Sequence, residues 1–155
     1  MLSASVDKSK LRVYALNMLQ TNPCACTNLR RAARAITHLY DRALEPAGLK
    51  VTQFAMLRAV LRRGPASISE LAAETHLERT TFGRNVALLE RDGLVALSPG
   101  DDQRQRTVTL TGRGKRAVDT AIPLWEQTQE RVTKTLGRSR LEQLTVLLVE
   151  VEALG

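Results

Sequence analysis

The chain has 155 residues, about the length of one domain, and 43% of them are hydrophobic, which is enough for a packed core. This composition excludes wholesale disorder, and the absence of a run of about 18 uncharged apolar residues excludes a transmembrane helix. The formal net charge of +7 favours an acidic partner such as nucleic acid, while only 3% aromatic residues argues against stacking on single-stranded bases. We therefore expect a protein that binds no membrane, has no secretory signal and works in the cytoplasm.

The spacing of hydrophobic residues predicts a mainly helical chain. Five positions are expected to cap helix N-termini: Asn22 before Pro23, Thr52, Ser67 with Glu70 in a capping box, Thr111, and Ser139 in a second capping box. Gly and Pro residues mark where several helices end. The expected helices cover roughly residues 9–20, 29–44, 53–63, 69–76, 79–91, 112–136 and 140–154.

The hydrophobic period changes from that of a helix to that of a strand after residue 93. Residues 94–98 and 106–110 read as two strands, and the polar residues 99–105 between them predict a hairpin with a charged tip. Two short helices followed by such a hairpin predict a winged helix-turn-helix, in a mainly α fold with a small two-stranded β-wing. The expected organisation is one compact domain with an N-terminal arm (1–22), a first helix for dimerisation and ligand binding (23–51), a DNA-binding lobe (52–111) and C-terminal dimerisation helices (112–155).

The second helix of this motif fits the major groove of double-stranded DNA, where residues in its first turns can reach base edges and phosphates. Phe82 and Val86 are expected to face the core and to leave the polar side chains of this helix outside. The alternative is that the arginines form an ordinary solvated surface. The residues predicted to bind DNA are Ser69, Arg79, Thr80, Thr81, Arg84, Asn85, Arg104 and Arg106.

The charged tip of the hairpin carries a second prediction. Arg104 is expected to enter a narrow minor groove, where the negative potential is concentrated. Asp102 would repel phosphates if it faced the duplex, so we expect it to position the wing by accepting backbone hydrogen bonds or by pairing with Arg84 or Arg106.

Residues 68–114 resemble the winged-helix core of the multiple-antibiotic-resistance regulator (MarR) family. The resemblance is carried by Arg84 on the helix, the LLERDGLV segment at residues 88–95, and Asp102-x-Arg104 followed by Leu110-Thr111. It extends over roughly residues 24–150. Two features depart from it: Gly112 replaces a more usual polar residue, and residues 1–23 lie outside the match.

The resemblance implies a homodimer held by the terminal helices, and the six large aliphatic side chains between Leu141 and Leu154 agree with that. It also implies a small-molecule effector of unknown identity, bound between the dimerisation helices and the DNA-binding lobe. The alternative is that the same residues fill the core. By position this site would use Thr37, His38, Tyr40, Met56 and Trp125.

Cys24 and Cys26 leave three hypotheses open: a structural role, a redox sensor and a metal site. A thiolate near a helix N-terminus has a lowered pKa, which favours oxidation, and the spacing disfavours a bond between the two residues of one chain. A partner cysteine across the dimer would then be needed. The two histidines, His38 and His76, show no metal-ligand spacing with the cysteines, and we expect both to be structural.

The sequence contains no phosphate-binding loop, no G-x-S-x-G and no H-E-x-x-H, so we expect no enzyme and no required cofactor. We predict a homodimeric, sequence-specific regulator of transcription that binds double-stranded DNA at a pseudo-palindromic operator. We expect it to act as a repressor released by a small-molecule effector, and to join the nucleoid when bound. Three alternatives remain: a thiol-redox-sensing repressor, a metal-responsive repressor and a winged-helix protein-interaction module.

Overall fold

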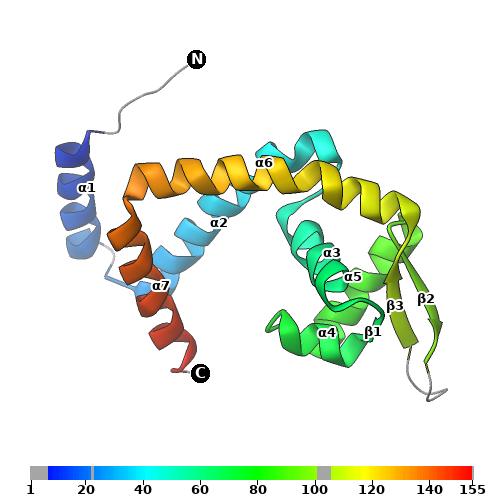
Figure 1. The fold of residues 1–155 in the computed structure, drawn as a ribbon. Helices are drawn as coiled ribbons and strands as arrows, with labels where there is room; N and C mark the ends of the chain where they lie inside the picture. The colour runs from blue at the N-terminus through cyan, green and yellow to red at the C-terminus, as the bar shows by residue number, and fades with distance from the viewer. Residues whose placement is uncertain (1–6, 22, 101–105, 155) are drawn as a thin grey trace. The chain divides into compact units, whose positions relative to one another are not determined.

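The computed structural model describes residues 7–21, 23–100 and 106–154 (Figure 1). Its contacts divide the chain into two compact units, one up to His38 and one from Leu39 onward, where the sequence predicted a single compact domain. The division arises because no described side chain before Leu44 is buried, so the N-terminal part adds nothing to the core. The elements are α1 (Lys8–Thr21), α2 (Ala25–Leu44), the 3-10 helix η1 (Glu45–Ala47), α3 (Val51–Arg63), β1 (Ala66–Ser67), α4 (Ile68–Glu74), α5 (Arg79–Arg91), β2 (Val95–Pro99), β3 (Arg106–Leu110), α6 (Gly112–Leu136) and α7 (Arg138–Glu152).

The N-terminal unit consists of α1 and the part of α2 up to His38. The side chain of Asp7 accepts a hydrogen bond from the Ser9 backbone N–H at 3.0 Å and so satisfies a donor at the start of α1. The Arg31 guanidinium on α2 lies 5.8 Å from the Tyr14 ring centroid, within the range of a cation–π contact. Its Nη1 also lies 3.2 Å from the Met18 sulfur. Arg31 therefore joins the two helices of this unit.

The second unit holds the core. Its largest fully buried side chains come from the end of α2, from α3 to α6 and from strands β2 and β3, and include Leu44, Phe54, Leu71, Phe82 and Val108. Helix α6 packs against both α3 and η1, and α4 packs against α5. The predicted inward positions of α5, Phe82 and Val86, are both buried, so its outer face is polar as the sequence indicated.

The sheet has three antiparallel strands in the order β1-β3-β2, not the two that the sequence predicted. Strands β2 and β3 form the expected hairpin, with Leu97 opposite Val108. The missed strand, β1, is two residues long and places Ala66 on the other side of Val108. A segment this short cannot show a period of two, and Ser67 carried only a capping signal.

Two of the five predicted N-caps are confirmed, and a third, Asn22, lies outside the described residues. Ser67 Oγ accepts from the Glu70 N–H at 3.2 Å while Glu70 accepts from the Ser67 N–H at 2.9 Å, and Thr111 caps α6. Thr52 does not cap α3: the helix begins at Val51, two residues earlier than expected, and the Val51 N–H donates to Asp41 Oδ1 at 2.8 Å. Nor does Ser139 cap α7, which begins at Arg138 after Gly137.

The joint between the hairpin and α6 is the tightest backbone contact around a glycine in the described chain. A Cβ atom on Gly114 would lie 1.9 Å from the carbonyl oxygen of Leu94 and 2.9 Å from its carbon. Thr111 Oγ1 donates to the Gly93 carbonyl at 2.7 Å and accepts from the Gly114 N–H at 2.9 Å. Only glycine fits here, because the first turn of α6 lies against the backbone that enters β2. No helix in the described part is long and apolar enough to cross a membrane.

We expect Gly114→Ala to lower the free energy of unfolding by about 1–3 kcal/mol, because the added methyl group forces backbone to move. Gly112→Ala is the matched control on the same turn, since its Cβ would meet only the flexible end of Arg116 at 3.6 Å. Urea unfolding followed by circular dichroism measures both. Equal stability of the two variants would show that the joint tolerates a side chain.

Candidate nucleic-acid interface

The turn between α4 and α5 sets the angle of the helix-turn-helix. His76 has a φ of 52°, in the left-handed region that few non-glycine residues adopt. The turn is closed by the Leu77 N–H, which donates to the Ala72 carbonyl at 3.0 Å. His76 is exposed, and its place in the turn agrees with the structural role predicted for it.

Helix α5 presents its N-terminal half to solvent. Arg79, Thr80, Thr81 and Arg84 are exposed and Asn85 is half-buried, whereas Phe82 and Val86 are buried. The buried side chains hold the helix against the core, so its outer face is fixed in orientation. A rigid helix with polar and cationic side chains in its first turns is the geometry that reads base edges in a major groove.

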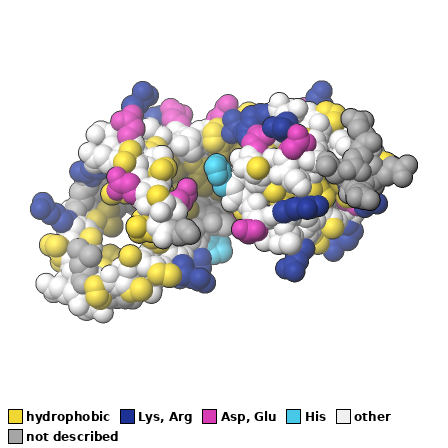
Figure 2. All heavy atoms as spheres, turned by 90° about the horizontal axis from the view of Figure 1, so that it is seen from below, with side chains coloured by type: hydrophobic (Ala, Val, Ile, Leu, Met, Phe, Trp, Pro, Cys, Tyr) yellow, Lys and Arg dark blue, Asp and Glu magenta, His cyan; other side chains and the backbone are white. Residues whose placement is uncertain are grey.

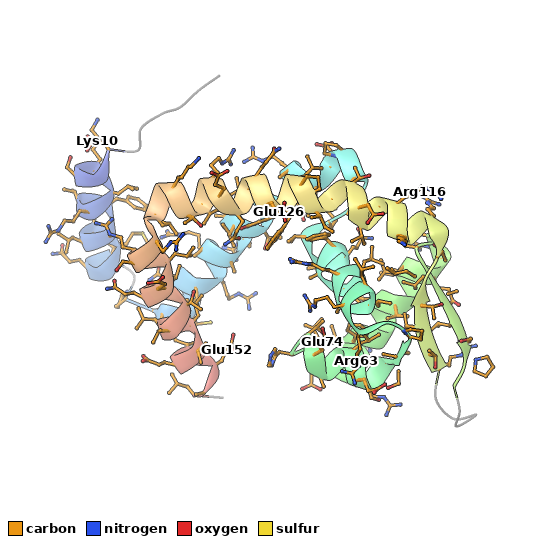
Figure 3. All side chains as sticks on the ribbon, in the orientation of Figure 1. Lys10, Arg63, Glu74, Arg116, Glu126 and Glu152 are labelled. Carbon is orange, nitrogen blue, oxygen red and sulfur yellow. The ribbon has the colours of Figure 1, made fainter. Side chains whose placement is uncertain are left out.

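Five arginines of this unit, two on α3 and three on α5 and β3, differ in whether a carboxylate pairs with them. Arg62 and Arg63 on α3 pair with Glu74 and Glu70 on α4, at 2.8 Å and 2.9 Å (Figure 3, where Arg63 and Glu74 are labelled). Within the described part of the chain, no carboxylate pairs with any of Arg79, Arg84 and Arg106. The second group is therefore free to meet an external anion.

A groove of about 380 Å³ brings together residues of four elements, β1, α4, α5 and β3. It collects four of the predicted DNA-binding residues, Ser69, Arg79, Thr80 and Arg106. Three other lining residues were missed by the sequence: Ser67, Ile68 and Gly83. Its full lining is Ser67, Ile68, Ser69, Arg79, Thr80, Gly83 and Arg106.

The other predicted DNA-binding residues lie outside the groove lining. Thr81, Arg84 and Asn85 continue along α5 from the groove. Asp102 and Arg104 fall among residues 101–105, outside the described residues, so the arrangement of the wing tip stays a prediction. On the face that Figure 2 shows, the Lys and Arg side chains are spread out and do not gather in one dense block.

Comparison with known proteins supports the reading of this face. The MarR family model matches residues 47–105. The M. tuberculosis transcriptional regulator MosR, solved in complex with DNA, is 40% identical, covers 84% of this chain and 96% of that chain, and gives a TM-score of 0.74. The transcriptional activatory protein BadR of Rhodopseudomonas palustris is 37% identical over 117 residues, 66% of this chain and 67% of BadR. The chain belongs to the MarR family.

The family resemblance seen in the sequence is thus confirmed, and with it the winged helix-turn-helix of a DNA-binding transcriptional regulator. A repressor of the homoprotocatechuate degradative operon in Escherichia coli is 27% identical over 128 residues, 82% of this chain and 86% of the repressor. The curated relatives align over 61% to 86% of their own length. Because one relative activates and another represses, the direction of regulation does not follow from membership of the MarR family.

The residues predicted from the MarR resemblance to bind an effector differ in burial and lie in both units. Thr37 and His38 are exposed in the N-terminal unit, while Met56 is buried in the core of the second. The half-buried Tyr40 hydroxyl donates to Gln129 Oε1, and burial raises the pKa of Tyr40. Of these residues, Tyr40 and Met56 lie in the second unit together with Trp125.

Trp125 has two neighbours on α3. Its ring centroid lies 6.2 Å from that of Phe54, and the Arg58 guanidinium lies over it at 4.3 Å. Arg58 was missed because nothing in the sequence marks which arginine will lie against an aromatic ring. It is half-buried, and within the described residues no carboxylate pairs with it.

Both cysteines of this MarR-family chain are exposed thiols at the start of α2. A hydrogen bond with the Thr27 side chain, followed by one with its backbone, lowers the pKa of the Cys24 thiol. The residues described include no group of three His, Cys, Asp or Glu side chains that could hold a metal ion.

Proposed function

We propose that this MarR-family regulator acts as a homodimeric repressor on a pseudo-palindromic operator and is released by a small-molecule effector. A dimer on a promoter excludes the polymerase, and an effector that changes the spacing of the two reading helices releases it. The reading helices of a dimer must lie about 34 Å apart to enter successive major grooves. We place the protein in the cytoplasm, associated with the nucleoid when bound, and expect no resident cofactor.

The observation that carries this proposal is the group of arginines without a carboxylate partner on α5 and β3. Such side chains suit phosphates and the acceptors of guanine, which arginine binds in a bidentate way. The complex of MosR with DNA supports the same role for the helix-turn-helix, because that protein is 40% identical to this chain. For the wing, we propose that Arg104 enters the minor groove and that Asp102 positions it.

The homodimer is supported by the exposed apolar surface of α7. No residue of this helix is buried, yet aliphatic side chains occur on several of its faces. An apolar helix left uncovered in water is unfavourable and marks an interaction surface. The exposed aliphatic side chains at the C-terminus are Leu144, Val146, Leu147, Leu148, Val149, Val151 and Leu154.

We propose that the effector contacts Tyr40 and Trp125. Gln129, the acceptor for Tyr40, lies four residues after Trp125, so both side chains meet the same face of α6. Arg58 over the Trp125 ring would favour an anionic, planar ligand. Thr37 and His38 remain predictions from the family resemblance.

The rival hypothesis from another class is a winged-helix module that binds only protein. A DNA-binding protein that neutralises phosphates loses affinity steeply as salt rises, whereas a protein-interaction module would show no binding to duplex at all. A metal-responsive repressor is the other alternative. The metal content of protein purified without chelator distinguishes it.

We expect Arg84→Ala to weaken binding to the operator by about 1–3 kcal/mol, the cost of losing one good base contact. The operator is first selected from a random duplex pool, and affinity is then measured by fluorescence anisotropy against operator and scrambled duplexes. Arg62→Ala is the matched control, because Arg62 is engaged with Glu74 on another face. It should leave both affinities nearly unchanged.

The pattern of loss decides the role of Arg84. A loss confined to the operator assigns it to base recognition. An equal loss on both duplexes reassigns it to a phosphate, and no loss on either removes it from the interface. If the wild-type protein binds no duplex at low salt, the proposed function is wrong.

We expect the protein to sediment as a dimer at micromolar concentration. Leu144→Asp with Leu148→Asp should produce monomers, because two charges on the apolar face of α7 cannot be buried without a large cost. Gln143→Asp adds charge to the same helix at an exposed polar position and should leave the dimer intact. A monodisperse wild-type monomer in analytical ultracentrifugation would contradict the proposal.

A second candidate function is redox sensing, favoured by the two exposed thiols and by the lowered pKa of Cys24. We propose that peroxide oxidises the Cys24 thiolate to a sulfenic acid and that a cysteine of the other subunit then displaces water. In total, two thiols lose two protons and two electrons, one peroxide becomes two waters, and one disulfide forms. The bond would link the subunits near the start of α2.

We expect mild peroxide to give a dimer on non-reducing electrophoresis and to lower operator affinity, and Cys24→Ser to abolish both effects. Cys26→Ser tests which thiol completes the bond. Loss of thiols without a crosslink would contradict the intersubunit link. Unchanged affinity after complete oxidation would leave the cysteines a structural role.

A further inference from the structure

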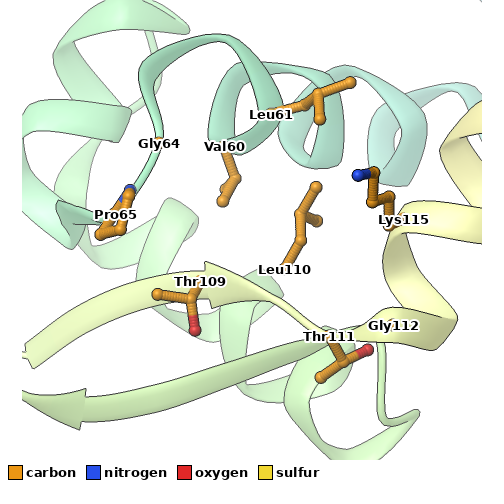
Figure 4. A pocket seen from close by; sticks show the side chains of 9 residues that line it. All are labelled: Val60, Leu61, Gly64, Pro65, Thr109, Leu110, Thr111, Gly112 and Lys115. Atoms are coloured by element: carbon orange, nitrogen blue, oxygen red, sulfur yellow. The ribbon is translucent and has the colours of Figure 1, made fainter.

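A second cavity lies on the winged-helix unit, away from the DNA-binding groove. It has a volume of about 310 Å³ and lies between the end of α3, strand β3 and the first turn of α6 (Figure 4). This is the lower end of the range for small-molecule sites. Its lining is Val60, Leu61, Gly64, Pro65, Thr109, Leu110, Thr111, Gly112 and Lys115.

The cavity combines an apolar wall with one positive edge. Val60, Leu61 and Leu110 face the space from opposite sides, and the Lys115 ammonium points toward the rim beside Leu61 (Figure 4). No acidic side chain lines it. Within the described residues, no carboxylate pairs with Lys115, so its charge is available to a ligand.

The first turn of α6 adds to this positive edge. Thr111 Oγ1 satisfies the Gly114 N–H, while the N–H groups of Gly112 and Arg113 have no acceptor among the described residues. These groups lie at the positive end of a 25-residue helix. The lysine and the helix end therefore favour a negative group at one side of an otherwise apolar cavity.

We propose that this cavity binds a small monocarboxylate with a compact apolar body. The carboxylate would lie against Lys115, and the apolar part would be covered by Val60 and Leu110. The site differs from the one proposed around Trp125, because ten residues of α6 separate Lys115 from Trp125, about 15 Å along the helix axis.

Because of where the cavity lies, a bound ligand would affect DNA recognition. Gly64 and Pro65 connect α3 to β1, and Thr111 connects the end of β3 to α6, so a ligand here touches both connections. Its occupation would fix the base of the wing relative to α3. This regulatory step rests on the proposed function, whereas binding itself does not.

The test is a titration of the full chain, with labelled Val and Leu methyl groups, by benzoate in NMR. We expect saturable shifts at Val60, Leu61 and Leu110. Lys115→Gln should weaken binding about tenfold, as expected for losing one charge-assisted hydrogen bond, and Lys115→Arg should restore most of it. Benzamide has the same ring without the charge and should bind as weakly as benzoate binds the Lys115→Gln variant.

Lys134→Gln is the matched control, because it removes one positive charge from α6 outside the cavity. It should bind benzoate like the wild type, and thermal unfolding should show that both lysine variants are folded. Equal affinity of Lys115→Gln and wild type, no saturable binding, or shifts confined to methyl groups elsewhere would each overturn the site.

A parallel anisotropy measurement separates this inference from the proposed function. If benzoate binds in the cavity and changes duplex affinity, both the site and its regulatory role are supported. Binding with unchanged affinity would overturn the regulatory role alone. If the protein binds no duplex, the proposed function fails, while the methyl shifts still decide whether the site exists.

Discussion

The contact between the first turn of α6 and the backbone of Leu94 is the constraint on which the winged-helix unit depends. With no side chain on Gly114, the helix can lie directly on the peptide that enters β2. The Thr111 hydroxyl then donates a hydrogen bond to the Gly93 carbonyl and accepts one from the Gly114 N–H. The start of α6 and the start of the wing therefore form one rigid joint, because neither can move without breaking these hydrogen bonds and leaving their donors and acceptors unpaired.

This joint determines where the DNA-binding elements lie. Strand β2 follows α5 after a short turn, and β3 leads directly into α6, so both strands of the wing are anchored at one end. Val108 in the middle of β3 is fully buried and pairs with Leu97 on one side and Ala66 on the other. Arg106 is thereby carried next to Arg79, although 27 positions separate them in sequence. The groove is a product of strand pairing and not of local sequence.

The features that the sequence predicted best are those encoded locally. The bounds of α5 and the capping box at Ser67 follow from side chains within one or two turns of each other. The features it missed depend on distant partners: β1 exists because β3 lies beside it, and α3 begins at Val51 because Asp41 accepts its N–H. The same holds for Gly114. The need for glycine at this position follows only from the structure, where a Cβ atom would lie 1.9 Å from the carbonyl oxygen of Leu94.

The ion pairs of the arginines indicate better than the net charge of +7 which residues can bind DNA. Hydrogen bonds from the Ser67 backbone and from Arg63 lower the pKa of Glu70 to about 2, so this carboxylate stays ionised. It accepts hydrogen bonds from the start of α4 and from one arginine of α3, and it is not part of the groove lining. Ser67 takes part in both features, since its hydroxyl caps α4 while the residue lines the groove. The acidic residues of α4 thus pair with the exposed arginines at the end of α3, whereas Arg79, Arg84 and Arg106 have no carboxylate partner among the described residues.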